Sequence, residues 1–184
     1  MAKTALIPIA DGTEELEAVA IIDTLRRGGV QVTVASVMPD LQVTASRQVK
    51  LVADALITDC VTNTYDLIAL PGGIPGAEHL RDSAPLIDML KRQKEEGRLY
   101  GAICASPAVA LSPHGLLQGV KATCYPGYEK EFTDAEAVDD RVVVDGTCIT
   151  SKGPGTAIEY ALKLLEVLFD ADKAEKVGKP MLAL

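Results

Sequence analysis

The segment RLYGAICASPAVAL, residues 98–111, joins a strand-like pattern to a helix-like pattern with almost no loop between them. Cys104 lies at the junction. The residues that flank it are small: Gly101, Ala102, Ala105 and Ser106. An abrupt strand-to-helix turn pushes its side chain out at the carboxyl edge of a sheet, where unpaired N–H groups of the next helix face it. Such surroundings favour a thiolate, so we predict that Cys104 is a reactive nucleophile rather than a merely packed side chain.

The beginning of the chain predicts a parallel sheet. Residues 4–9 are almost wholly apolar, as expected of a strand that is covered on both faces. Residues 14–27 carry apolar side chains near helical spacing and end at a glycine pair, and residues 30–37 return as a strand. A strand-helix-strand unit of this kind is typical of an open α/β sheet.

Later segments continue the alternation. We expect a hairpin-like excursion within 43–52, helices at 85–96 and 156–169, and strands at 66–70, 121–124, 141–144 and 148–151. Turns rich in glycine or polar residues follow three of the predicted strands, at 11–17, 71–76 and 104–107. Ligands of open α/β sheets bind outside the carboxyl ends of the strands, so the site should lie where these turns converge.

Length and composition predict one α/β domain over residues 1–184. The chain is 48% hydrophobic, enough for a sizeable core without disulfides. Its four cysteines show no C-x-x-C pair and only two histidines accompany them, so we expect no structural metal and a reducing compartment. We find neither a secretory signal nor a run of roughly 18 apolar residues. A net charge of -8 disfavours nucleic acid as a partner. We therefore expect a cytoplasmic protein that binds neither membranes nor nucleic acid.

Glu17 is the second candidate of the site. It follows the first turn of the predicted helix and can face the sheet edge, where burial and a nearby thiolate would raise its pKa. Protonated, it would donate a hydrogen bond to the sulfur. Gly72 and Gly73 can be read as a simple tight turn. If that turn faces Cys104, the backbone N–H groups of Gly73 and Ala105 together form an oxyanion site.

Other polar residues receive plainer interpretations from the sequence alone. His114 lies near the far end of the helix that follows Cys104, so a direct Cys-His pair is not expected. His79 fits a surface loop, and Arg47 a solvated charge. The remaining cysteines, Cys60, Cys124 and Cys148, lack the junction that marks Cys104 and are interpreted as structural.

Four motifs together resemble the ThiJ/PfpI superfamily, specifically its DJ-one or ThiJ-like branch. They are DGTEELE at 11–17, LPGG at 70–73, AICA at 102–105 and TSKGPGT at 150–156, and the resemblance runs nearly end to end. It implies a flavodoxin-like three-layer sandwich with a mostly parallel sheet and a nucleophile elbow, usually as a homodimer. It also implies an oxidisable Cys104, a protonated Glu17, backbone donors at Gly73 and Ala105, and an Arg47 that reaches toward the partner's pocket.

The resemblance implies activity on small reactive carbonyl compounds without a cofactor. The expected reaction is a glutathione-independent glyoxalase or a related protein deglycase, and the alternative is a redox sensor or stress chaperone that works through oxidation of Cys104. A third possibility is a structural dimer with a relic thiol. Two expected pocket residues depart from the family pattern: Ser106 replaces a frequent glycine, and Tyr125 replaces the histidine of some members. Ala105 replaces the histidine of the protease-like branch, which disfavours peptidase activity.

Overall fold

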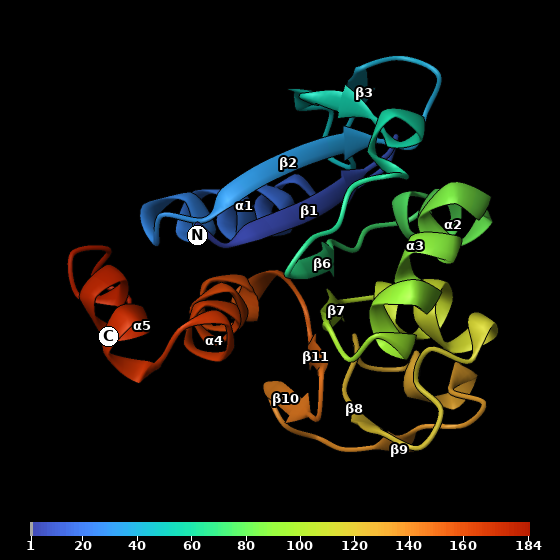
Figure 1. The fold of residues 1–184 in the computed structure, drawn as a ribbon. Coiled ribbons are helices and arrows are strands. Elements are labelled where there is room, and N and C mark those ends of the chain that lie inside the picture. The colour runs from blue at the N-terminus through green and yellow to red at the C-terminus, as the bar shows by residue number, and fades with distance from the viewer. Residues whose placement is uncertain (1) are drawn as a thin grey trace.

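A computed structural model describes residues 2–184 and shows a central sheet with helices on both faces (Figure 1). The sheet has seven strands in the order β10-β11-β7-β6-β1-β2-β5, and every neighbouring pair is parallel except β10 with β11. The strands are β1 (Thr4–Ile9), β2 (Gln31–Ser36), β5 (Ala55–Leu56), β6 (Leu67–Leu70), β7 (Leu99–Ile103), β10 (Val142–Asp145) and β11 (Cys148–Ser151). The predicted α/β sandwich is thus confirmed.

Two helical layers cover this sheet. The helices are α1 (Glu15–Arg27), α2 (Gly76–Asp82), α3 (Ala84–Glu95), α4 (Ala157–Leu168) and α5 (Ala171–Gly178). Helices α1, α4 and α5 pack together on one face, whereas α3 packs on the other (Figure 1). In the described part of the chain, no helix combines the length and the apolar character needed to cross a bilayer.

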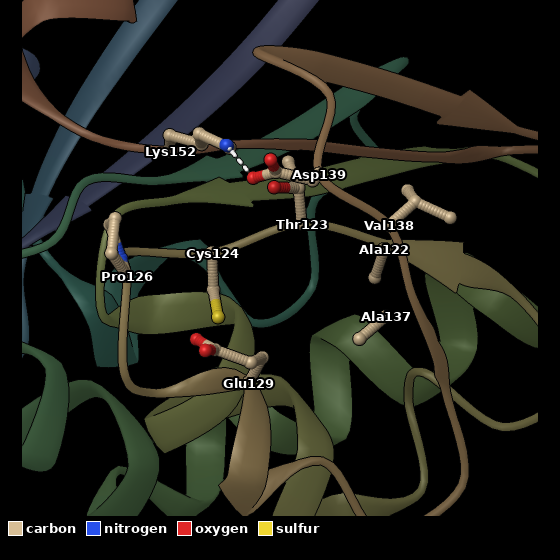
Figure 2. Close-up of a pocket in the computed structure, with 9 residues that line it drawn as sticks. All are labelled: Ala122, Thr123, Cys124, Pro126, Glu129, Ala137, Val138, Asp139 and Lys152. Atoms are coloured by element: carbon tan, nitrogen blue, oxygen red, sulfur yellow. Dashed lines mark hydrogen bonds and ion pairs between the residues drawn. The ribbon is translucent and has the colours of Figure 1, made fainter.

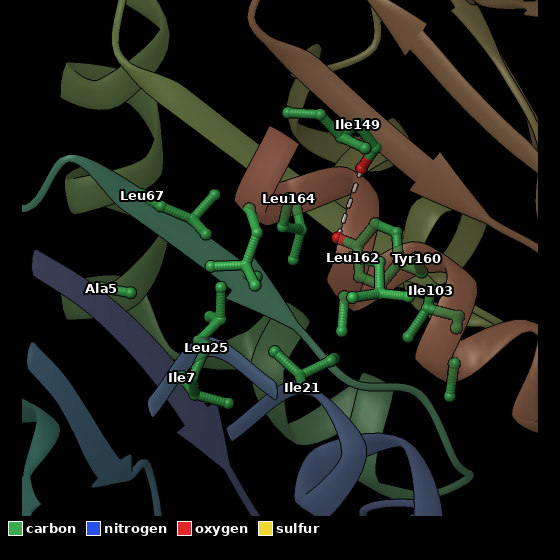
Figure 3. Close-up of a cluster of buried hydrophobic side chains, with 14 of the residues drawn as sticks. Ala5, Ile7, Ile21, Leu25, Leu67, Ile103, Ile149, Tyr160, Leu162 and Leu164 are labelled. Atoms are coloured by element: carbon green, nitrogen blue, oxygen red, sulfur yellow. Dashed lines mark hydrogen bonds between the residues drawn. The ribbon is translucent and has the colours of Figure 1, made fainter. Parts of the chain in front are cut away.

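The core between α1, α4 and the sheet supports the strand that leads to Cys104 (Figure 3). Tyr160 of α4 is fully buried, and its hydroxyl donates to the carbonyl of Ile149 at 3.4 Å. A Cβ on Gly101 of β7 would lie 2.2 Å from that carbonyl oxygen and 2.6 Å from the tyrosine hydroxyl. Gly101 therefore lets the tyrosine pack against the central strands, because any side chain at this position would push β7 and β11 apart.

Several local expectations are corrected by the structure. The helix expected after Cys104 is a short π-helical segment, Pro107–Leu111, followed by a 3-10 turn at Ser112–His114. The strand expected at 121–124 covers only β8 (Lys121–Ala122), which pairs with β9 (Glu136–Ala137) outside the main sheet. Helices α2 and α5 were not expected at all. The excursion within 43–52 is confirmed as a hairpin, formed by β3 (Gln42–Thr44) and β4 (Lys50–Val52).

Candidate active site

The turn at Cys104 has the backbone geometry of an elbow. Cys104 adopts φ +65°, in the left-handed region that residues other than glycine rarely occupy. Two hydrogen bonds hold the backbone of Cys104 there. The Cys104 N–H donates to the Ser151 carbonyl at 3.0 Å, and the Tyr125 N–H donates to the Cys104 carbonyl at 2.8 Å. Strained backbone of this kind persists only where the surrounding structure fixes it. The elbow predicted from the sequence is therefore present, and it is held by β11 and by the loop that follows β8.

Gly72 brings Cys104 and Glu17 together. A Cβ on Gly72 would lie 2.5 Å from the Cβ of Cys104 and 2.9 Å from Oε2 of Glu17, so only glycine leaves room for both side chains. Gly73, at φ +89°, packs equally closely on the chain before α1, since a Cβ there would lie 2.4 Å from the Gly12 carbonyl oxygen. The three turns at 11–17, 71–76 and 104–107 thus converge at one edge of the sheet, as predicted.

Glu17 is a buried carboxyl with one unpaired oxygen. The side chain is fully buried, and its Oε2 accepts a hydrogen bond of 2.7 Å from the Gly72 N–H. Within residues 2–184, Oε1 has no partner with full hydrogen-bond geometry, although the Cys104 thiol lies near enough to lower the pKa of this carboxyl. Burial outweighs these donors and raises the pKa of Glu17 to about 7. Glu17 thus titrates near neutrality, in the first turn of α1 rather than beyond it.

The Cys104 thiol does not match the expectation of a resting thiolate. Its side chain is 9% exposed, and burial, followed by the charge of Glu17, raises the pKa of the thiol to about 12. The N–H groups of Gly73 and Ala105 lie close enough to the sulfur to lower that pKa, but they do not offset the burial. Burial thus raises the pKa of both groups, and the pair loses its first proton near neutral pH.

The side chains of Ser106 and Tyr125 were expected to line the pocket, but the structure places both elsewhere. Ser106 is fully buried and donates to the Pro71 carbonyl at 2.6 Å, so its hydroxyl joins the elbow to the 71–76 turn and is not free in a pocket. The Tyr125 side chain is 46% exposed and lies beside Gly153, where a Cβ would be 3.2 Å from its ring. Tyr125 contributes its backbone N–H to the site, and nothing places its hydroxyl there.

Arg47 is not part of the cluster within this chain. Its side chain is exposed, and among residues 2–184 its guanidinium donates only to the carbonyl of Ser46, at 3.4 Å. Its backbone N–H is held by Glu15, whose carboxylate accepts from it at 2.8 and 3.1 Å and from the Ser46 hydroxyl at 2.9 Å. Glu15 lies in the first turn of α1, where the helix dipole alone favours a carboxylate, so its role in holding the hairpin could not be read from the sequence.

The two histidines and the other cysteines lie away from the pair. His114 contacts the Arg81 carbonyl at 2.9 Å through Nε2, and His79 lies on α2 rather than on a loop. Cys60 and Cys148 are each 1% exposed in the core. Residues 2–184 contain no group of three or more His, Cys, Asp or Glu side chains placed to hold a metal ion.

Cys124 lines a cavity of about 250 Å³ behind the loop of Tyr125 (Figure 2). Its sulfur points toward the carboxylate of Glu129, while Lys152 pairs with Asp139 on the other side of the loop. Burial raises the pKa of the Cys124 thiol to about 12, as at Cys104. Unlike Cys104, Cys124 lies beside an exposed carboxylate and outside an elbow, so we retain the structural interpretation.

A cysteine on a strained strand-to-helix elbow, beside a buried glutamate at the carboxyl edge of a parallel sheet, defines a class of α/β proteins with a nucleophile elbow. Comparison with known proteins specifies the class further. Residues 3–167 match the DJ-1/PfpI family, and the chain belongs to this family.

The relatives include proteins of plants, animals and a protist. "Protein DJ-1 homolog B" of Arabidopsis thaliana is 51% identical over 96% of this chain, and "Glutathione-independent glyoxalase DJR-1.2" of Caenorhabditis elegans is 37% identical over 97% of this chain and 96% of its own length. The structure of "Toxoplasma gondii DJ-1, oxidized" superimposes with a TM-score of 0.96 at 51% identity, covering 98% of both chains. The chain spans 40% and 46% of the lengths of the two Arabidopsis relatives that it matches.

Proposed function

We propose that this protein converts small 2-oxoaldehydes such as methylglyoxal into 2-hydroxy acids, with Cys104 as the nucleophile and without a cofactor. The observation that carries the proposal is the buried Glu17 carboxyl, with a pKa of about 7, facing a thiol on a strained elbow. A general base is most effective when its pKa is near the working pH. The name of the nematode relative, a glutathione-independent glyoxalase, supports the same reaction for this chain.

In the first step, Glu17 acts as the base. Its carboxylate takes the proton from Cys104 as the sulfur forms a bond to the aldehyde carbon and the carbonyl π electrons move to the oxygen. Glu17 then returns that proton to the oxygen, which becomes the hydroxyl of a hemithioacetal, and the carboxylate is ionised again. In this proposal the N–H groups of Gly73 and Ala105, which lie close enough to the sulfur to lower the pKa of the thiol, stabilise the oxyanion. Because the proton moves during the attack, a resting thiolate is not needed.

In the second step, hydrogen moves within the substrate. Glu17, ionised again, takes the proton from the former aldehyde carbon, and the proton of the hemithioacetal hydroxyl passes to the ketone oxygen. Glu17 then gives its proton to the former ketone carbon while the carbonyl re-forms on the carbon bound to sulfur, which leaves a 2-hydroxy thioester on Cys104. Water then adds to the thioester, the carbon-sulfur bond breaks, and the 2-hydroxy acid leaves while the sulfur regains a proton. The net reaction adds one water to the oxoaldehyde, so no external oxidant or reductant is consumed.

The experiment measures lactate formed from methylglyoxal by the wild type, Cys104→Ser and Glu17→Gln, with Cys124→Ser as a matched control cysteine. We expect loss of turnover in the first two variants and wild-type turnover in the control. Wild-type kcat/KM should rise as the pH passes about 7, because Glu17 must be deprotonated to act as the base. Unchanged turnover in Cys104→Ser would contradict the proposal.

A second candidate function is a redox sensor or stress chaperone. The unpaired Oε1 of Glu17 and the N–H groups near the sulfur could hold the oxygens of an oxidised Cys104. Peroxide would convert the thiol to a sulfenic acid with release of water, and a second peroxide would give the sulfinic acid. The structure of the Toxoplasma relative is that of an oxidized protein, which favours this alternative. Peptide mass spectrometry should then show Cys104 oxidised before the other three cysteines; uniform oxidation would contradict it.

We also infer a homodimer that works in the cytoplasm. Apolar side chains are exposed on the two packed helices α1 and α4, with Leu16 53% and Ile158 43% exposed. A contiguous apolar surface of this kind is typical of an interface. The four free cysteines support a reducing compartment.

A further inference from the structure

A single peptide unit connects the elbow to Glu17. The carbonyl of Pro71 and the N–H of Gly72 belong to the same planar, trans unit, so they point in opposite directions. On one side, the Pro71 carbonyl accepts from the Ser106 hydroxyl at 2.6 Å. On the other side, the Gly72 N–H donates to Oε2 of Glu17 at 2.7 Å. Because the unit is rigid, a rotation that breaks the first bond also disturbs the second.

Both bonds are shielded from solvent. The side chains of Ser106 and Glu17 are fully buried, and Pro71 and Gly72 are buried as well. Within residues 2–184, no other group donates a hydrogen bond to the Pro71 carbonyl. A buried carbonyl that loses its donor bears the cost of desolvation without compensation. The Ser106 hydroxyl is therefore what satisfies and orients this peptide unit from the side of the elbow.

The 71–76 turn is fixed to α1 by its backbone but to the elbow by a side chain. The Gly72 carbonyl accepts from the Glu14 N–H at 2.8 Å, next to the bond from the Gly72 N–H to Glu17. Substitution of Ser106 leaves the backbone bond to Glu14 available and removes only the contact from the elbow. The effect of that contact on Glu17 can thus be measured separately from the attachment to α1.

We propose that Ser106 is a positioning residue that acts on Glu17 through the Pro71–Gly72 peptide unit, because its hydroxyl orients this unit and strengthens the hydrogen bond to the Glu17 carboxylate. A donor bound to a carbonyl oxygen polarises the peptide unit and makes its N–H a stronger donor in turn. A stronger donor stabilises the ionised carboxyl and so lowers its pKa. Ser106 would thereby offset part of the effect of burial on Glu17.

Other groups around Glu17 also act on its pKa. The charge of Glu14, on the same helix, raises the pKa of Glu17, and the Cys104 thiol on the elbow lowers it. The Tyr160 hydroxyl on α4 lies near enough for the charge of Glu17 to raise its own pKa, and burial keeps this phenol neutral. Replacing Ser106 changes none of these three groups, so a change in the titration of Glu17 would report on the peptide unit.

The test titrates Glu17 by infrared spectroscopy, following the band of its protonated carboxyl, which is identified by its absence in Glu17→Gln. In the wild type the band should disappear with a midpoint near pH 7. In Ser106→Ala the midpoint should rise by about half a pH unit, because a weaker donor at Gly72 stabilises the carboxylate less. Ser106→Gly also lacks the hydroxyl and should shift the midpoint equally, which provides a second variant should alanine not fold.

The pH dependence of turnover gives a second readout. The rise of kcat/KM for methylglyoxal should move to higher pH by the same amount in both variants. This readout rests on the proposed function, whereas the infrared titration does not. A shifted band in a protein that does not turn over methylglyoxal would contradict the proposed function and still support the role of Ser106.

Ser112→Ala is the matched control. Ser112 lies further along the segment that follows the elbow, is 2% exposed, and accepts from the Thr133 N–H at 3.0 Å. Its substitution also removes a buried serine hydroxyl but leaves the Pro71–Gly72 unit intact, so the wild-type midpoint is expected. An unchanged midpoint in Ser106→Ala, or an equal shift in Ser112→Ala, would overturn the inference.

Discussion

The two ionisable groups of this site, the Cys104 thiol and the Glu17 carboxyl, both have raised pKa values, whereas the elbow motif suggests a resting thiolate. Both Cys104 and Glu17 are buried, and burial raises both pKa values, to about 12 for the thiol and about 7 for the carboxyl. Above about pH 7 the pair therefore holds a single proton. Reactivity then depends on transfer to the carboxylate during attack, and a low thiol pKa is not required.

The raised pKa of Glu17 also predicts how stability depends on pH. Its folded-state pKa of about 7 lies above the ordinary value of 4.5 for a glutamate, so the neutral carboxyl is favoured in the fold. Its stabilising effect is complete below about pH 4.5 and is lost as the pH rises through about 7. Glu17→Gln removes this ionisation, so chemical denaturation should show the variant gaining about 3 kcal/mol relative to the wild type between pH 4.5 and pH 8. A constant difference over that range would contradict the assignment of the buried charge.

For single residues, the sequence indicated which side chains lie at the site better than it indicated their protonation, burial and hydrogen-bond partners. Small residues around Cys104 indicated the elbow, and the glycine pair indicated the donor turn. Burial and a nearby thiolate were both expected to raise the pKa of Glu17, but desolvation acts on the Cys104 thiol as well, and no sequence pattern gives the depth of burial. Ser106 was misplaced for a similar reason, because its partner, the Pro71 carbonyl, lies on a distant turn.

At the scale of elements, the β3-β4 hairpin is attached to the helix that carries Glu17. Side chains at the start of α1 and in the turn before it hold the hairpin: Asp11 accepts from the Thr44 N–H at 2.8 Å, and Glu15 accepts from Ser46 and Arg47. Glu15 is only 8% exposed, so water does not readily replace these bonds. The position of Glu17 is thereby coupled to a hairpin that contributes nothing to the main sheet.

Replacing Glu15 should release that hairpin. In Glu15→Ala, the N–H of Arg47 loses its acceptor, whereas the Ser46 hydroxyl keeps the Glu14 carboxylate at 2.9 Å, and we expect a loss of about 1–3 kcal/mol in the free energy of unfolding. Hydrogen exchange at residues 44–49 should accelerate while exchange in the central strands changes little. Glu15→Gln keeps one acceptor oxygen and should lie between the wild type and the alanine variant. Unchanged exchange in the hairpin would show that Glu15 does not hold it.

Strong periodic patterns predicted the long helices and strands. Short elements were not predicted, because few residues define each of them. The strands at 4–9 and 148–151 and the helices beginning near 15 and 157 were predicted within a residue or so of their observed bounds. The seven residues of α2 follow a Pro-Gly-rich turn that indicates only a loop in the sequence. The segment after Cys104 adopts π-helical rather than α-helical geometry, a difference that apolar spacing over five residues cannot show.

At the scale of the whole molecule, the exposed apolar side chains of α1 and α4 test the inferred homodimer. Leu16→Asp would place a charge within that surface and should convert a dimer into a monomer, measured as a halved mass by light scattering after gel filtration. Val144→Asp is the control, because Val144 is 44% exposed on β10, the strand at the edge of the sheet. A wild-type monomer, or an unchanged mass in Leu16→Asp, would contradict the inference.

The bond from the Cys104 N–H to the Ser151 carbonyl has a consequence for the newly made chain. Translation delivers the cysteine well before its acceptor, and the glutamate still earlier. A chain that has not yet grown as far as β11 lacks the contact that fixes the bend. On the ribosome, Cys104 is then an ordinary flexible thiol, and its special chemistry begins only when the central sheet closes around it.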